Sequence, residues 1–77
     1  MTVDRVAALV SKVTKTPDIA QEPDLDLVDA GLLDSLAFVE LLVGLEEIVG
    51  VSVPPTEVDR HELATLNLIR AFVAEYP

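Results

Sequence analysis

The sequence predicts an all-α fold: a four-helix bundle of three main helices and one short helix, with a long first loop. Apolar residues recur at helical spacing in three separate segments of the chain. Aromatic residues make up only 4% of the sequence, which disfavours a sheet, whereas 51% of its 77 residues are apolar, which favours a folded domain. We therefore expect residues 1–77 to form a single small helical domain.

The first helix is predicted over residues 2–15. Thr2 is a candidate N-cap, and Lys12 and Lys15 near the other end suit the helix dipole. Its apolar positions at helical spacing are Val3, Val6, Val10 and Val13. A long connection with two prolines and a glycine follows over residues 16–34, and such loops are usually functional or anchored by apolar side chains. The candidate anchors are Leu25, Leu27, Val28, Leu32 and Leu33.

The strongest helix is predicted over residues 36–49. Asp34 and Ser35 stand where N-caps belong, and Gly50 is placed to end the helix in a left-handed conformation. The stripe that should face the core consists of Phe38, Leu41, Leu45 and Ile48.

Two further helical segments follow the double proline at 54–55. Thr56 with Asp59 three residues later resembles a capping box, which predicts a short helix over residues 57–62. Thr65 is a candidate cap for a last helix. The apolar positions of that helix are Leu66, Leu68, Ile69, Phe72 and Val73.

The net charge is −9, and the charges are unevenly distributed. No Lys or Arg occurs between Lys15 and Arg60, a span rich in Asp and Glu. Such a surface repels phosphate backbones and anionic lipid and attracts basic protein patches, so we expect protein partners, no nucleic acid and no membrane. There is no Cys and no apolar run near the ~18 residues of a membrane span. We expect a monomeric, cytoplasmic protein.

Ser35 is the first candidate functional residue, although its place at a helix start makes it by default a cap. The only His is His61, which lies between Arg60 and Glu62 in a polar segment, so no convincing Ser–His–Asp triad can be assembled. We therefore predict that the chain is not an enzyme. Ser35 is instead a candidate acceptor, because a phosphate attached there would lie against the free N–H groups of the helix start.

Two other groups of residues are candidates for a metal site and for a docking surface. Asp24, Asp26 and Asp29 do not match the spacing of a calcium loop, and apolar residues interrupt them, so we expect no metal site. A second stripe of the strongest helix mixes apolar and acidic residues at steps of three and four. Its members are Leu36, Glu40, Val43 and Glu47. If exposed, this stripe would suit a partner with an apolar depression and a basic rim.

The segment GLLDSL at residues 31–36 resembles the attachment motif of the acyl and peptidyl carrier protein family, in which Asp-Ser-Leu opens an acidic second helix. VEL at 39–41 and LEE at 45–47 are similar to that helix in acyl carrier proteins. The resemblance implies an acyl-carrier-type bundle with 4′-phosphopantetheine attached covalently to Ser35, taken from coenzyme A by a phosphopantetheinyl transferase. It also implies a partner interface made of Asp34, Leu36, Glu40, Val43 and Glu47.

Residues 54–62, PPTEVDRHE, with Thr65 and Asn67 are similar to the same region of D-alanyl carrier proteins, which receive their amino acid from an adenylating aminoacyl ligase. Discrete carriers of bacterial polyketide and nonribosomal biosynthesis share this pattern. Scarce Lys and Asn indicate a high-GC genome and favour that second group. Such a carrier would hold a short acyl or aminoacyl group as a thioester for acyltransferases or other thioester-processing enzymes with basic docking patches. The alternative is a D-alanyl carrier for teichoic-acid-type cell-wall modification.

Phe38 departs from the family pattern. Acyl carriers that enclose a fatty chain usually have a small or polar residue at this place, so the resemblance implies that Phe38 fills that space. We therefore expect a short or polar cargo that stays outside the bundle.

Overall fold

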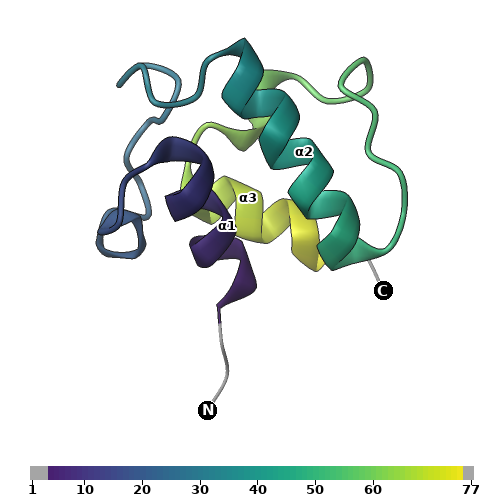
Figure 1. Ribbon diagram of the computed structural model, residues 1–77, viewed down its shortest axis with the longest axis horizontal. Helices are drawn as coiled ribbons and strands as arrows, with labels where there is room; N and C mark the ends of the chain where they lie inside the picture. Colours follow the sequence, from purple (N-terminus) through teal and green to yellow (C-terminus); the bar gives the residue numbers. More distant parts are fainter. Residues whose placement is uncertain (1–3, 76–77) are drawn as a thin grey trace.

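The computed structural model describes residues 4–75 of the chain. This part contains three α-helices and two short 3-10 helices, joined by loops (Figure 1). In chain order they are α1 (Arg5–Thr14), η1 (Ile19–Gln21), α2 (Ser35–Val49), η2 (Arg60–Leu63) and α3 (Leu66–Ala74). No strand occurs among residues 4–75. The predicted all-α class with three main helices, one short one and a long first loop is confirmed.

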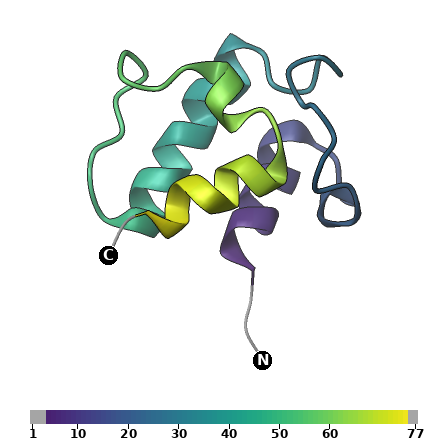
Figure 2. The same cartoon turned by 180° about the vertical axis from the view of Figure 1, so that it is seen from behind.

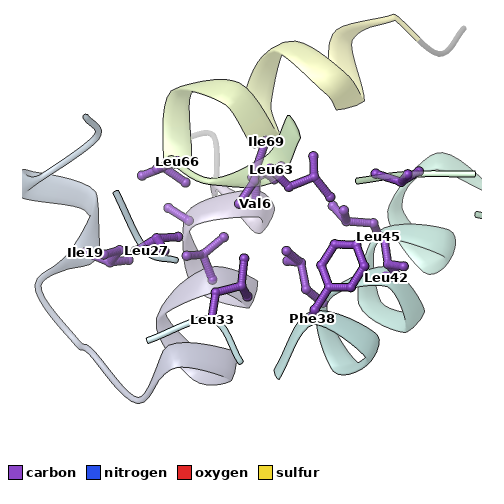
Figure 3. Packing of buried hydrophobic residues seen from close by; sticks show 14 of the residues in the cluster. Val6, Ile19, Leu27, Leu33, Phe38, Leu42, Leu45, Leu63, Leu66 and Ile69 are labelled. Carbon is purple, nitrogen blue, oxygen red and sulfur yellow. The ribbon is translucent and has the colours of Figure 1, made fainter. Parts of the chain in front are cut away.

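The three α-helices share one hydrophobic core. α1 contacts both α2 and α3, and the front and back views place α3 against one side of the α1–α2 pair (Figures 1 and 2). Figure 3 shows side chains from all three helices meeting between them. The most deeply buried residues are Val10, Ile19, Leu27, Leu41, Leu45, Leu63, Leu66 and Ile69.

Side-chain caps begin all three α-helices. The predicted cap Thr2 lies outside the described residues, and α1 is capped by Asp4, whose Oδ1 accepts from Ala7 N at 3.0 Å. Asp34 caps α2 and Thr65 caps α3, as expected for these residue types. Gly50, with φ of 79°, ends α2 in the left-handed conformation that was predicted for it.

The short helix lies later in the chain than predicted. Instead of residues 57–62, it covers Arg60–Leu63, and its N-cap is Asp59 rather than Thr56. Val58, only 8% exposed, belongs to the core, and Glu57 N donates to Pro54 O in a turn before it. Because the side chain of Val58 is buried in the core, residues 54–58 form a turn, and the helix begins only at Arg60.

The first loop is anchored as predicted. Leu27 and Leu33 are buried. The other three predicted anchors, Leu25, Val28 and Leu32, pack against the core from partly buried positions. The 3-10 helix η1 was not predicted from the sequence. It places Ile19 in the core with no exposed surface.

Hydrogen bonds also hold the first loop against the second half of the chain. Leu27 N donates to Ala64 O at 2.6 Å. Asn67 donates twice, from its backbone N to Pro23 O at 3.0 Å and from Nδ2 to Asp24 Oδ1 at 2.8 Å. The loop that leads to Ser35 is therefore held by both apolar and polar contacts.

Candidate functional site

Ser35 is the first residue of α2, and its side chain is exposed. The capping role belongs to Asp34, whose backbone is extended and whose Oδ1 accepts from Ala37 N at 2.8 Å. The Asp34 carbonyl accepts from Phe38 N, also at 2.8 Å. Within the described residues the Ser35 hydroxyl has no hydrogen-bond partner, so it takes no part in forming the helix.

The start of α2 is suited to an anion. Neither Ser35 N nor Leu36 N donates to a residue between 4 and 75, because Asp34 satisfies only the N–H of Ala37. Unsatisfied N–H groups and the helix dipole together favour a negatively charged group at such an end. A phosphodiester on the Ser35 hydroxyl would lie beside these donors, so the residues present fit a phosphate-linked group.

The backbone directly before Ser35 is held in a tight turn. Leu32 N and Leu33 N both donate to Leu27 O, at 2.9 and 3.0 Å. Gly31 has a φ of 76°, in the left-handed region where glycine avoids the strain of a Cβ. Since Leu27 N is bonded to Ala64 O, the turn before Ser35 is connected through hydrogen bonds to the η2–α3 segment.

The predicted stripe on α2 is exposed along its whole length. Leu36 is 69% exposed and Val43 is 54% exposed, and the side chains of Glu40 and Glu47 are exposed between and beyond them. Asp34, at the same end as Ser35, is exposed as well. Val39, which was not predicted as part of this surface, is 45% exposed on the same side. Its position three residues after Leu36 and four before Val43 was the signal that could have found it.

The neighbouring Glu46 has a different role from Glu47. Its Oε2 accepts from Val53 N at 2.7 Å and from Ser52 Oγ at 3.3 Å, so it ties the chain after α2 back to the helix. Val53 is buried in the core. Glu46 therefore stabilises the fold, whereas Glu47 has its side chain exposed to solvent.

Phe38 lies inside the hydrophobic core (Figure 3). Its position two residues from both Leu36 and Glu40 places it on the side of α2 opposite the exposed stripe. It is 8% exposed, and Leu41 and Leu45 beside it are 1% and 0% exposed. This burial agrees with the expectation that Phe38 fills the space under the start of α2. The expectation that cargo stays outside the bundle remains a prediction.

The other polar candidates form no site with Ser35. His61 is exposed on η2 and its backbone N donates to Asp59 Oδ1. Asp26 Oδ1 accepts from Asp29 N at 2.9 Å, and Asp24 binds Asn67. Over residues 4–75, no group of three or more metal-ligating side chains is gathered. No helix within that range is both long and apolar enough to cross a membrane.

Comparison with known proteins agrees with this geometry. The family described as the phosphopantetheine attachment site matches residues 4–73, which include the whole of α2. The chain belongs to this family. It therefore carries 4′-phosphopantetheine as a covalently bound prosthetic group. When bound, the group supplies a terminal thiol that carries an acyl group as a thioester.

The chain is also similar to several curated members of the family. It is 39% identical to the D-alanyl carrier protein of Listeria monocytogenes serovar 1/2a over 66 residues, which cover 86% of this chain and 85% of the relative. The D-alanyl carrier protein of Abiotrophia defectiva is 39% identical over 70 residues, 91% of this chain and 89% of that protein. The one from Lactococcus lactis subsp. lactis is 35% identical over 72 residues, 94% and 91% of the two chains. The chain is thus a phosphopantetheine carrier and is similar over most of its length to proteins of this name.

Proposed function

We propose that this protein is a D-alanyl carrier whose prosthetic group is attached to Ser35. The observation that carries the attachment site is the exposed Ser35 hydroxyl at the start of α2, beside N–H groups that suit a phosphate. The choice of D-alanine as the amino acid is supported by the D-alanyl carrier proteins that match this chain over most of both lengths. In this role Asp34 caps α2 and so holds Ser35 at the exposed start of the helix. As the residue directly before Ser35, Asp34 is also placed for recognition by a phosphopantetheinyl transferase.

The relatives reverse the order of the two functions that the sequence left open. The discrete carrier of polyketide or nonribosomal biosynthesis is favoured only by the scarcity of Lys and Asn, which indicates a high-GC genome, and none of the relatives reported above carries that name. Asn67, part of the resemblance to D-alanyl carriers, also has a structural role here through Pro23 and Asp24. The proposal therefore includes the teichoic-acid-type cell-wall modification that was the alternative, with the carrier acting in the cytoplasm.

The partners perform the chemistry in this proposal. A phosphopantetheinyl transferase modifies Ser35, an adenylating aminoacyl ligase loads the amino acid, and an acyltransferase or another thioester-processing enzyme receives it. The exposed stripe of Leu36, Glu40, Val43 and Glu47 is the proposed docking surface for all of them. Its two apolar side chains would enter apolar depressions on a partner, and its two carboxylates would face a basic rim.

The attachment residue is tested by incubating the protein with coenzyme A and a broad-specificity phosphopantetheinyl transferase and measuring the intact mass. We expect the wild type to gain the mass of one phosphopantetheine and Ser35→Ala to gain nothing. Since the Ser35 hydroxyl makes no hydrogen bond within residues 4–75, Ser35→Ala should keep the wild-type helical circular dichroism. Ser52→Ala, at another exposed serine, is the matched control and should be modified normally. An undiminished mass gain on Ser35→Ala would disprove the assignment.

The amino acid is tested on the modified protein with a D-alanine-adenylating ligase and ATP. We expect one alanyl residue to be added from D-alanine, faster than from L-alanine or glycine. The added mass should disappear after mild hydroxylamine treatment, which cleaves thioesters. Loading by acyltransferases from acyl coenzyme A donors, with none by the ligase, would favour the polyketide or nonribosomal alternative instead.

A further inference from the structure

Two hollows adjoin each other on the side of α2 that faces α1. The first, of about 210 Å³, lies directly beside the attachment residue, since both chain neighbours of Ser35, Asp34 and Leu36, line it. The second, of about 460 Å³, lies between α1 and the later turns of α2. Val13 and Glu40 line both hollows, so the two meet at these residues, and together they are called here the α1–α2 groove.

The groove has apolar walls over most of its second hollow. Leu9 and Val13 come from α1, and Val39 and Val43 come from α2. Gly44 also lines it, and this glycine allows the helices to lie close together: a Cβ at this position would stand 2.3 Å from Leu9 Cδ1. Val39 and Val43 keep about half of their surface exposed, 45% and 54%, so no described residue covers the α2 wall of the groove.

The charged groups around the groove are arranged along its length. Lys15, the residue that ends α1, lines the hollow beside Ser35 together with Asp34. Asp34 is engaged as a cap by Ala37 N. Farther along, Glu40 and Glu47 stand on the α2 side, and Lys12 stands on the α1 side. Among residues 4–75 Lys15 has no ion pair, and it lies in the hollow beside Ser35. Glu40 stands where the two hollows meet, and Glu47 and Lys12 line only the second.

The groove is long enough for the prosthetic group. With a rise of about 1.5 Å per residue, Glu40 lies about 7.5 Å and Glu47 about 18 Å beyond Ser35 along the axis of α2. Fully extended, phosphopantetheine is comparable in length to an extended pentapeptide, roughly 17 Å. Its thiol end would then lie near Glu47, about one turn beyond Val43 and Gly44.

We propose that the α1–α2 groove holds the phosphopantetheine arm and its aminoacyl group on the outside of the bundle. This inference rests on the proposed function. Lys15 and the start of α2 face the phosphate, the apolar walls contact the methyl and methylene groups, and Glu40 and Glu47 face the ammonium group of the amino acid. Burial of Phe38 in the core agrees with a binding place outside the bundle.

The groove shares Glu40, Val43 and Glu47 with the proposed docking surface. A partner whose basic groups bind these carboxylates would compete with the ammonium group for the same residues. Docking would then free the aminoacyl group from the groove at the moment a partner needs it.

The experiment compares backbone amide NMR spectra of four forms: unmodified protein, protein with the bare arm, and protein loaded with D-alanine or with propionate. Propionyl has the carbon chain of alanyl but no ammonium group, which makes it the matched control cargo. All forms can be made by transferase from the corresponding coenzyme A derivatives. The intact mass of each sample shows separately whether the arm and cargo are attached, so a failure of the proposed function would be seen there.

We expect attachment of the arm to shift the amide signals of Lys15, Val13 and Gly44, and D-alanyl to add shifts at Glu40 and Glu47 that propionyl does not. Glu40→Gln with Glu47→Gln should remove the difference between the two cargoes, and Glu57→Gln, at an exposed position in another loop, should keep it. Leu68 and Ala71, which line a hollow on α3, serve as the reference surface and should not shift. Shift changes confined to Ser35 and its chain neighbours, in correctly loaded samples, would overturn the proposal.

Discussion

The two sides of α2 differ in their surroundings more than in their composition. One side places Phe38, Leu41, Leu42 and Leu45 in the core, and the other leaves Leu36, Val39 and Val43 exposed. A helix that is apolar on nearly all sides is ordinarily buried on all sides. Exposed apolar residues grouped on one side, with carboxylates between them, are instead typical of a contact surface. The buried side of α2 therefore stabilises the fold, and we propose that the exposed side serves recognition.

The largest expected effect comes from the buried side. Phe38→Thr removes an aromatic ring that is only 8% exposed, which should lower the free energy of unfolding by about 3–5 kcal/mol. Leu36→Thr, on the exposed side of the same helix, should change it by about 0.5 kcal/mol or less. Urea denaturation of the two variants measures the difference. Equal losses would mean that the two sides are not distinct in stability.

Position 38 also tests whether the cargo lies inside or outside the bundle. In wild-type protein loaded with D-alanyl or a longer acyl group, we expect no cargo-dependent shift of the Leu41 and Leu45 amide signals, since Phe38 occupies the core beside them. Cargo-dependent core shifts that Phe38→Thr enlarges or abolishes would contradict a binding place outside the bundle.

The next largest expected effect is a difference in stability between variants of two adjacent glutamates near the end of α2. Glu46→Ala removes the acceptor of Val53 N and should lower the free energy of unfolding by about 1–3 kcal/mol, because a backbone donor loses its charged partner. Glu47→Ala removes an exposed carboxylate, and we expect a change of about 0.5 kcal/mol or less. Thermal unfolding followed by circular dichroism compares the pair. If Glu47→Ala were the more destabilising, the division between the two glutamates would be wrong.

A smaller effect, on recognition alone, is expected from the exposed side. Leu36→Ala should raise the KM of the phosphopantetheinyl transferase about fivefold, which corresponds to about 1 kcal/mol of lost docking energy. Stability should stay within about 0.5 kcal/mol of wild type, as for other exposed positions. Val51→Ala is the control, because Val51 is 50% exposed but lies outside α2. A KM that rises equally in both variants would show that the stripe on α2 has no special part in docking.

Sequence reasoning succeeded for the features that depend on neighbours along the chain. The start and end of α2 follow from Asp34 and Gly50, and its buried and exposed stripes follow from helical spacing. The attachment residue and the docking stripe rest on a motif and a period in the same way, and both stay predictions. One local signal was wrong: the pairing of Thr56 with Asp59 predicted a helix over residues 57–62, whereas Asp59 itself caps a helix that begins at Arg60.

The features that were missed depend on contacts between distant segments. Ile19 gave no periodic signal because it is a single apolar residue in a loop, yet the core includes it. The shift of η2 to Arg60–Leu63 depends on the burial of Val58. The α1–α2 groove requires the relative placement of two helices, which a pattern within either helix does not specify.

The smallest expected effect comes from a contact in which α2 takes no part. Asp4 accepts from Ala7 N and from Arg70 Nη2, so it both caps α1 and joins it to α3. The hydrogen bond from Ala7 N, followed by the interaction with Arg70, lowers the pKa of the Asp4 carboxyl below its ordinary value. Because the pKa is lower in the folded than in the unfolded protein, the ionised carboxylate adds stability above the unfolded pKa. That stability is lost as the pH falls through the folded value.

Asp4→Asn isolates this contribution, since Asn is also a good N-cap but has no charge to titrate. The Asp4 side chain is 46% exposed and that of Arg70 is 37% exposed, so solvent screens the pair. We therefore expect only a few tenths of a kcal/mol. Urea denaturation at pH 7 should show the wild type slightly more stable than Asp4→Asn, and the difference should decrease as the pH falls through the lowered pKa of Asp4 and shrink in high salt. Asp34→Asn, at the cap of α2, is the matched comparison, because Asp34 has no ion pair among the described residues. A pH-dependent difference as large for Asp34→Asn as for Asp4→Asn would mean that Arg70 adds nothing and that the helix cap alone accounts for the acid sensitivity.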